Sequence, residues 1–132
     1  MRLVNRDTDY AIRAICFIAQ STKKIISVSE LVNALKVPRS FLRKILQLLN
    51  KKKLLKSYKG QGGGFSLLVP VHKVFLLDLI EIFQEDFKLN ECFLKKDICP
   101  NTRKCQLKDK LDRIENYVLK ELKSITIADL LR

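Results

Sequence analysis

Residues 27–69 read SVSELVNALKVPRSFLRKILQLLNKKKLLKSYKGQGGGFSLLV, in which two short helical patterns precede a glycine-rich hairpin pattern. Ser27 and Glu30 have the spacing of a capping box, which predicts that a helix begins there. Pro38 suits the first position of a second helix, where a backbone N–H is not needed, and the apolar spacing continues to about Leu49. Two short helices joined by a few residues are typical of a helix-turn-helix.

The glycines of the chain are confined to one loop between two strand-like runs. All four lie within residues 60–64, between the runs 54–59 and 65–69. Glycine allows positive φ and close backbone approach, so this concentration predicts a β-hairpin with a glycine tip. A hairpin that follows a helix-turn-helix is the wing of a winged helix. The expected fold class is therefore mainly α with a small β-hairpin wing.

Helical patterns also flank this region on both sides. Apolar residues recur at helical spacing over residues 8–20, and again in a long helix that is expected to begin near Cys105. The long helix carries an apolar stripe made of Leu107, Leu111, Ile114, Val118 and Leu122. A small winged helix cannot cover so long a stripe by itself. We therefore expect it to form the interface of a homodimer, with packing onto its own domain as the alternative.

The positive charge of the chain is concentrated in its first part. Of 132 residues with a net charge of +12, residues 1–75 hold 15 Lys or Arg and 3 Asp or Glu, whereas residues 76–132 hold 11 of each. No acidic residue lies between Glu30 and Asp78. This distribution favours double-stranded DNA as the partner. We expect a winged-helix DNA-binding part at 1–75, and a cluster-binding loop with the dimerisation helix at 76–132, in one integrated domain.

Several classes of protein are disfavoured by what the sequence lacks. No run approaches the roughly 20 apolar residues of a membrane span, and the N-terminus lacks the apolar stretch of a signal peptide, so a cytoplasmic protein is expected. No nucleotide- or flavin-binding fingerprint is present, which argues against a redox enzyme. In a reducing compartment, the four cysteines of the chain are more often ligands or redox groups than disulfides.

Three cysteines form the group with the clearest chemical meaning. Cys92, Cys99 and Cys105 lie within 14 residues, with six and then five residues between them. A zinc ribbon is disfavoured because there is no C-x-x-C pair. Soft thiolates suit an iron–sulfur cluster, although free or redox-paired thiols remain the alternative. Cys16 lies among apolar residues and is expected in the core, and His72 is expected at the surface.

The chain resembles the Rrf2 family of bacterial winged-helix regulators over nearly its whole length. The motifs that carry the resemblance are TDYAIRA at residues 8–14, SEL at 29–31, KGQGGGF at 59–65, the cysteine loop, and TIADL at 126–130. Together these motifs are specific, whereas singly only the wing and the cysteines would be. The resemblance implies a DNA-binding transcriptional regulator and no enzyme activity.

Within this family the chain is most similar to the nitric-oxide-sensing repressors. Members of that type hold a 4Fe–4S cluster with three cysteines and, in some, an aspartate from the first helix of the partner subunit. The resemblance implies Cys92, Cys99, Cys105 and Asp9 as ligands, with a 2Fe–2S cluster as the alternative. Regulators of iron–sulfur biogenesis instead use a histidine where this chain has Lys108, which cannot ligate as an ammonium. Asp9 also suits a first helical turn without any ligand role.

The same resemblance implies which residues contact DNA. Ser40, Arg43 and Lys44 are expected to face bases, and Arg39 and residues 51–53 to contact phosphates. The wing tip, made of Lys59, Gly60, Gln61 and Gly62, is expected at the adjacent minor groove.

A twofold dimer implies a near-palindromic operator. The expected function is a repressor gated by an iron–sulfur cluster that senses nitric oxide, redox or iron status. The alternative is a cluster-free regulator of the same family that senses a metabolite or a partner protein.

Overall fold

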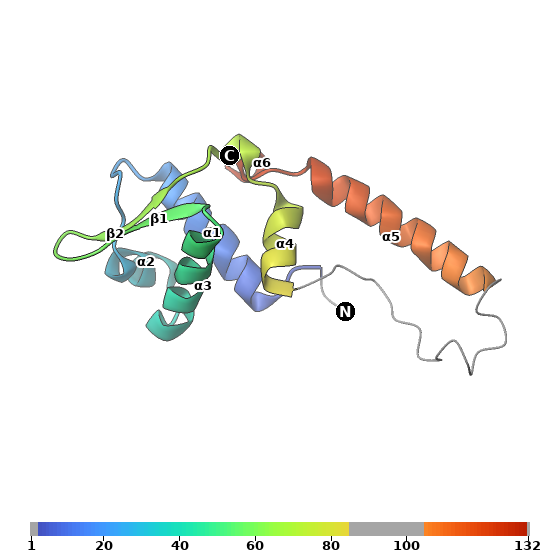
Figure 1. The fold of residues 1–132 in the computed structure, drawn as a ribbon, viewed down its shortest axis with the longest axis horizontal. Helices are drawn as coiled ribbons and strands as arrows, with labels where there is room; N and C mark the ends of the chain where they lie inside the picture. Colours follow the sequence, from blue (N-terminus) through green and yellow to red (C-terminus); the bar gives the residue numbers. More distant parts are fainter. Residues whose placement is uncertain (1–2, 85–104, 132) are drawn as a thin grey trace.

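The computed structural model describes residues 3–84 and 105–131, so Cys92 and Cys99 lie outside the described residues. The elements are α1 (Arg6–Gln20), α2 (Val28–Leu35), α3 (Arg39–Lys51), β1 (Leu55–Tyr58), β2 (Gly64–Leu67), the 3-10 turn η1 (Val71–Lys73), α4 (Leu76–Gln84), α5 (Gln106–Ser124) and α6 (Ile127–Leu130). Figure 1 shows the helix-turn-helix and hairpin at one end and α5 extending from the other. The expected winged helix with a long C-terminal helix is confirmed.

The helix starts follow local capping signals. Ser27 caps α2, because its hydroxyl accepts the Glu30 N–H at 3.1 Å as the sequence predicts. The first helix begins at Arg6, two residues before the predicted start, because the Asn5 side chain accepts the Thr8 N–H at 2.8 Å. Pro38 precedes α3 as its N-cap and is not its first helical residue, which shifts that start by one position.

One buried apolar cluster joins α1, the helix-turn-helix, the wing and the C-terminus. Its members include Ala11, Ile15, Leu31, Leu42, Leu46, Leu49, Leu55, Phe65 and Ile127. Ile127 comes from α6, and its N–H donates to the Val74 carbonyl at 2.8 Å, so the end of the chain returns to the first part. As predicted, Cys16 packs against this core, where burial raises the pKa of its thiol, and His72 is exposed in η1.

The wing is a two-stranded antiparallel sheet in which Leu55 pairs with Leu67 and Tyr58 with Gly64. Phe65 also pairs with Ile26, just before α2: the Ile26 N–H donates to Phe65 at 2.9 Å, and the Phe65 N–H donates back at 2.8 Å. This bridge attaches the wing to the helix-turn-helix and fixes its direction.

Gly64→Ala is expected to lower the free energy of unfolding by about 2–4 kcal/mol, because its Cβ would stand 2.2 Å from the Ile26 carbonyl oxygen. Gly62→Ala is the matched control. Its Cβ would meet nothing within 4 Å, so only the strain of a φ of +77° remains, about 1 kcal/mol. Urea unfolding measures the free energy of unfolding of both variants. Equal losses would contradict the role given to the close approach at Gly64.

Candidate nucleic-acid interface

One face of α3 is buried and the other presents positive charge. Leu42, Ile45, Leu46 and Leu49 point into the core. On the opposite side Ser40, Arg43 and Lys44 are exposed, as a base-contacting surface requires. Within residues 3–84 and 105–131, neither Arg43 nor Lys44 forms an ion pair. Their charges are therefore free to meet an anionic partner.

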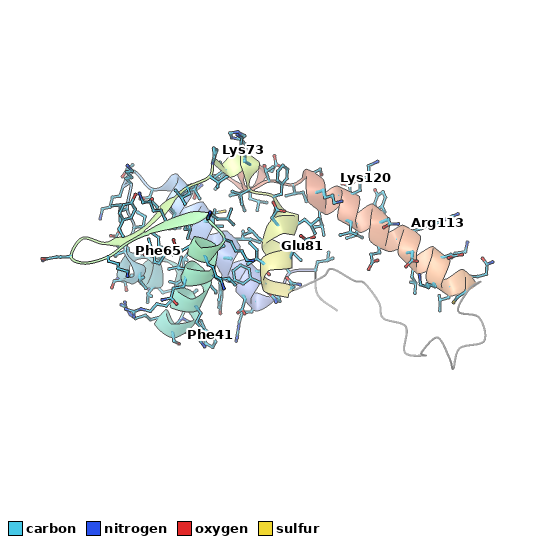
Figure 2. The ribbon with its side chains drawn as sticks, viewed as in Figure 1. Phe41, Phe65, Lys73, Glu81, Arg113 and Lys120 are labelled. Atoms are coloured by element: carbon cyan, nitrogen blue, oxygen red, sulfur yellow. The ribbon has the colours of Figure 1, made fainter. Side chains whose placement is uncertain are left out.

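The start of α3 is braced by contacts that local sequence patterns do not reveal. The Arg39 guanidinium donates to the Ser29 hydroxyl at 2.9 Å, which joins the first turns of α2 and α3. Phe41 is 38% exposed, and the Arg6 guanidinium lies 4.6 Å from its ring centroid (Figure 2). An exposed phenylalanine on such a helix can contact a thymine methyl group. Phe41 was not among the contact residues predicted from the sequence. An aromatic residue within an otherwise polar helix face was the signal that could have pointed to it.

The wing adds cations beside its exposed tip. Lys59, Gly60, Gln61 and Gly62 are all exposed. Next to them the Ser66 hydroxyl donates to the Tyr58 hydroxyl at 3.4 Å, and the Lys56 ammonium lies 5.2 Å from the Tyr58 ring centroid. The Ser66 hydrogen bond and the charges of Lys56 and Lys24 lower the pKa of Tyr58. The sequence indicated Lys59 as the cation of the wing, and the structure adds Lys24 and Lys56 close to Tyr58 of β1.

Of Cys92, Cys99 and Cys105, only Cys105 lies within the described residues. It is the N-cap of α5, half-buried, and its sulfur accepts the Lys108 N–H at 3.4 Å. The Lys108 ammonium lies 2.8 Å from an Asp112 carboxylate oxygen, and this hydrogen bond raises the pKa of Lys108. Lys108 is therefore a charged, paired ammonium and not a metal ligand. Across the described ranges, no group of three His, Cys, Asp or Glu side chains could hold a metal ion.

Asp9 lies in the first turn of α1, at the surface. Its carboxylate is 3.0 Å from the Arg13 guanidinium, in an i,i+4 pair with both side chains about half exposed. Such a pair contributes only about 0.3–0.5 kcal/mol to stability. The carboxylate is thus accessible.

The sequence pattern of the Rrf2 family, described as iron-dependent transcriptional regulators, matches residues 4–132. The chain belongs to the Rrf2 family. It is a DNA-binding transcriptional regulator and not an enzyme.

Curated relatives of this Rrf2 protein are distant but match along its length. It is 32% identical to protein aau3 of Rhizobium meliloti over 133 residues, covering 100% of this chain and 86% of the relative. Identity is 31% to a putative HTH-type transcriptional regulator of Aquifex aeolicus, covering 92% and 86% of the two chains. It is 29% to the HTH-type transcriptional regulator NsrR of Oceanobacillus iheyensis, covering 95% and 86%.

Solved structures share the fold. The global cysteine regulator CymR of B. subtilis superposes with a TM-score of 0.78 at 21% identity, over 99% of this chain and 97% of that one. The T. potens IscR structure gives a TM-score of 0.74 at 23% identity, over 98% and 86%. At these identities the likeness establishes the fold alone.

The α5 stripe of this Rrf2 protein is covered at one end only. Leu122 is 7% exposed and packs with Leu77 and Ile80 of α4. Towards the other end of the helix, Ile114 is 54% exposed and Leu107 is 67% exposed. Because α5 extends away from the body (Figure 1), the other described residues of its own chain leave Ile114 and Leu107 largely uncovered. None of the helices in the described ranges is long and apolar enough to cross a membrane.

The end of α4 is attached to the start of α1. The Gln84 side-chain oxygen accepts the Asn5 N–H at 2.9 Å and the hydroxyl of the fully buried Thr8 at 2.8 Å. Gln84 is the last described residue before the part of the chain that carries Cys92 and Cys99. The entry to that part is therefore held beside the helical turn that carries Asp9.

Proposed function

We propose that this Rrf2 protein is a homodimeric cytoplasmic repressor that binds a near-palindromic operator in double-stranded DNA. The observation that carries the proposal is the exposed cationic face of α3, which has no ion-pair partner in the described residues and lies beside a basic wing. In this proposal Ser40, Arg43 and Lys44 contact base edges in the major groove. Phe41, exposed on the same helix, joins them.

Contacts to the DNA backbone are proposed around this helix. Arg39 and residues 51–53 bind phosphates, which fix the register of α3 without reading sequence. The wing tip, made of Lys59, Gly60, Gln61 and Gly62, enters the adjacent minor groove, where A·T-rich DNA attracts cations.

The homodimer is proposed to form along the α5 stripe of Leu107, Leu111, Ile114, Val118 and Leu122. The exposure of Leu107 and Ile114 supports this assignment, because apolar side chains at heptad-like spacing are stable when a second helix covers them. Two copies related by a twofold axis place their α3 helices in half-sites about one turn of DNA apart.

We further propose that operator binding is gated by an iron–sulfur cluster that senses nitric oxide, redox or iron status, as in the NsrR type. Cys92, Cys99 and Cys105 with Asp9 of the partner subunit would hold it. The donor chemistry of Cys105 fits, because iron–sulfur clusters are held by cysteine sulfur and this sulfur is half-buried at the N-terminus of α5. The Asp9 carboxylate is accessible, as a ligand to a partner subunit's cluster must be. The ammonium of Lys108 is paired with Asp112, which agrees with a ligand set that does not include position 108. When bound, a 4Fe–4S cluster, or a 2Fe–2S cluster as the alternative, supplies iron that reacts with nitric oxide and oxygen.

Anaerobic purification tests the gating proposal. The expected result is a coloured protein whose absorbance spectrum changes on addition of nitric oxide, with parallel loss of operator binding in a mobility-shift assay. A colourless protein that binds its operator fully would overturn it. That result would favour the cluster-free regulator that senses a metabolite or a partner protein.

Lys59→Ala is expected to weaken DNA binding and to make it less dependent on salt. Each DNA phosphate charge that a lysine neutralises contributes about −0.9 to the slope of log affinity against log salt. The proposed dimer carries two copies of Lys59, so the variant should reduce the magnitude of the slope by about 1.8. Fluorescence anisotropy at several salt concentrations measures the slope. Lys73→Ala, in the exposed η1 turn (Figure 2), is the control and should leave it unchanged. A salt response that is flat in the parent protein would contradict the whole basic-face assignment.

A further inference from the structure

Two lysines adopt a backbone conformation that lysine disfavours. Lys36 has φ +58° and Lys53 has φ +65°, and they are the non-glycine residues with positive φ in residues 3–84 and 105–131. In this left-handed region the Cβ of an L-residue approaches a carbonyl oxygen, so glycine is the residue with the lowest strain.

The fold requires this conformation at both positions. Lys36 ends α2, and its N–H donates to the Val32 carbonyl at 2.9 Å before the chain turns into α3. After α3 the Leu54 N–H reaches back to the Leu49 carbonyl at 3.0 Å across Lys53. A left-handed residue closes helix ends of this kind, and glycine is its usual occupant. The side chains of Lys36 and Lys53 thus add strain and no helix-ending contact.

The position and surroundings of the two side chains point to an anionic ligand. Lys36 and Lys53 stand just before and just after α3, and both are exposed. In the described ranges neither forms an ion pair, and the sequence from residue 31 to 77 contains no acidic residue. Strained backbone positions are retained chiefly where the residue has a functional task.

We propose that Lys36 and Lys53 bind DNA phosphates at the two ends of the recognition helix α3, at the cost of folding stability. The inference rests on the proposed DNA contact of α3. It adds Lys36 as a backbone contact, and it explains why both turns carry lysine in place of the less strained glycine. The ligand class is the phosphodiester, so the contact strengthens binding to any DNA sequence.

The variants Lys36→Gly and Lys53→Gly should change stability and DNA affinity in opposite senses. Because each removes strain, the melting temperature should rise by about 2–4 °C. Because each variant also removes one phosphate contact from each subunit, the magnitude of the salt slope should fall by about 1.8 for the proposed dimer, and affinity at 0.1 M salt should fall roughly 60-fold. A mixed-sequence duplex is a sufficient probe, since phosphate contacts do not read sequence.

Matched variants separate charge from backbone. Lys36→Arg keeps the charge and should keep the affinity of the parent protein. Lys120→Ala removes an exposed positive charge from α5, away from α3 (Figure 2), and should leave the slope unchanged.

Glycine variants that melt higher but bind DNA with unchanged affinity and slope would overturn the inference, and so would glycine variants that melt lower. If the parent protein itself showed a flat salt response, the proposed DNA contact would fail, so the two failures are distinguishable.

Discussion

The double variant Leu111→Glu/Ile114→Glu is expected to be monomeric and to bind its operator about 10³-fold more weakly, or worse, while retaining weak non-specific DNA binding. Specific recognition needs two half-sites at once, and a single half-site loses the affinity contributed by the other. In the isolated chain Ile114 is already 54% exposed and Leu111 is half-buried, so glutamates there should leave the monomer folded. In the dimer they would place unpaired charges inside an apolar seam.

Analytical ultracentrifugation with circular dichroism measures the assembly and the fold of this variant. Asn116→Glu/Lys120→Glu is the matched control. Both of its residues are exposed on the opposite side of α5, so it should remain dimeric and bind DNA specifically. Leu122 is unsuitable for this test, because its packing against Leu77 and Ile80 is part of the fold. A Leu111→Glu/Ile114→Glu protein that sediments as a dimer would place the interface elsewhere.

Asp9→Asn is expected to make the proposed cluster labile and to release the operator without nitric oxide. The substitution keeps the size of the side chain and removes only its charge. Its structural effect should be small, because the Asp9–Arg13 pair is about half exposed and a first-turn carboxylate contributes about 0.3–1 kcal/mol. A large functional effect would therefore report ligation and not folding.

The readouts are iron content, the absorbance spectrum and operator affinity, all under anaerobic conditions, together with the melting temperature. Cys92→Ala should reproduce the phenotype of Asp9→Asn. Cys16→Ala should not, because Cys16 packs against the apolar core. If Asp9→Asn retains the parent spectrum and nitric-oxide response, Asp9 is only a favourable first-turn residue of α1.

Local signals in the sequence were sufficient for most of the fold. Ser27 was predicted as the cap of α2, and the glycine run as the hairpin tip. Cys105 was predicted to stand where the long helix begins. Each depends on residues a few positions apart, whose interaction follows from helical or hairpin geometry alone.

The remaining features depend on contacts between distant segments or on an unusual residue choice. The hydrogen bond between Asn5 and Gln84 joins residues 79 positions apart, and no local sequence pattern near either residue predicts it. The Arg6–Phe41 stacking likewise needs α1 and α3 to be packed first. The sequence predicted two helices joined by a few residues, but it did not predict the left-handed backbone of Lys36 between them, because glycine is the residue that normally signals one.

The attachment of α5 at one end gives it the mechanics of a lever. Its 19 residues span about 28 Å. Within the described residues the fulcrum is at Leu122, and the arm from there to Cys105 spans about 26 Å. A tilt of about 10° at the fulcrum displaces Cys105 by about 4 Å, given a rise of about 1.5 Å per residue. In the proposed dimer two such arms lie against each other, so a small displacement at their cysteine ends rotates the bodies at their fulcrums. The α3 helices on those bodies then lose the spacing of about 34 Å at which successive major grooves of one DNA face recur.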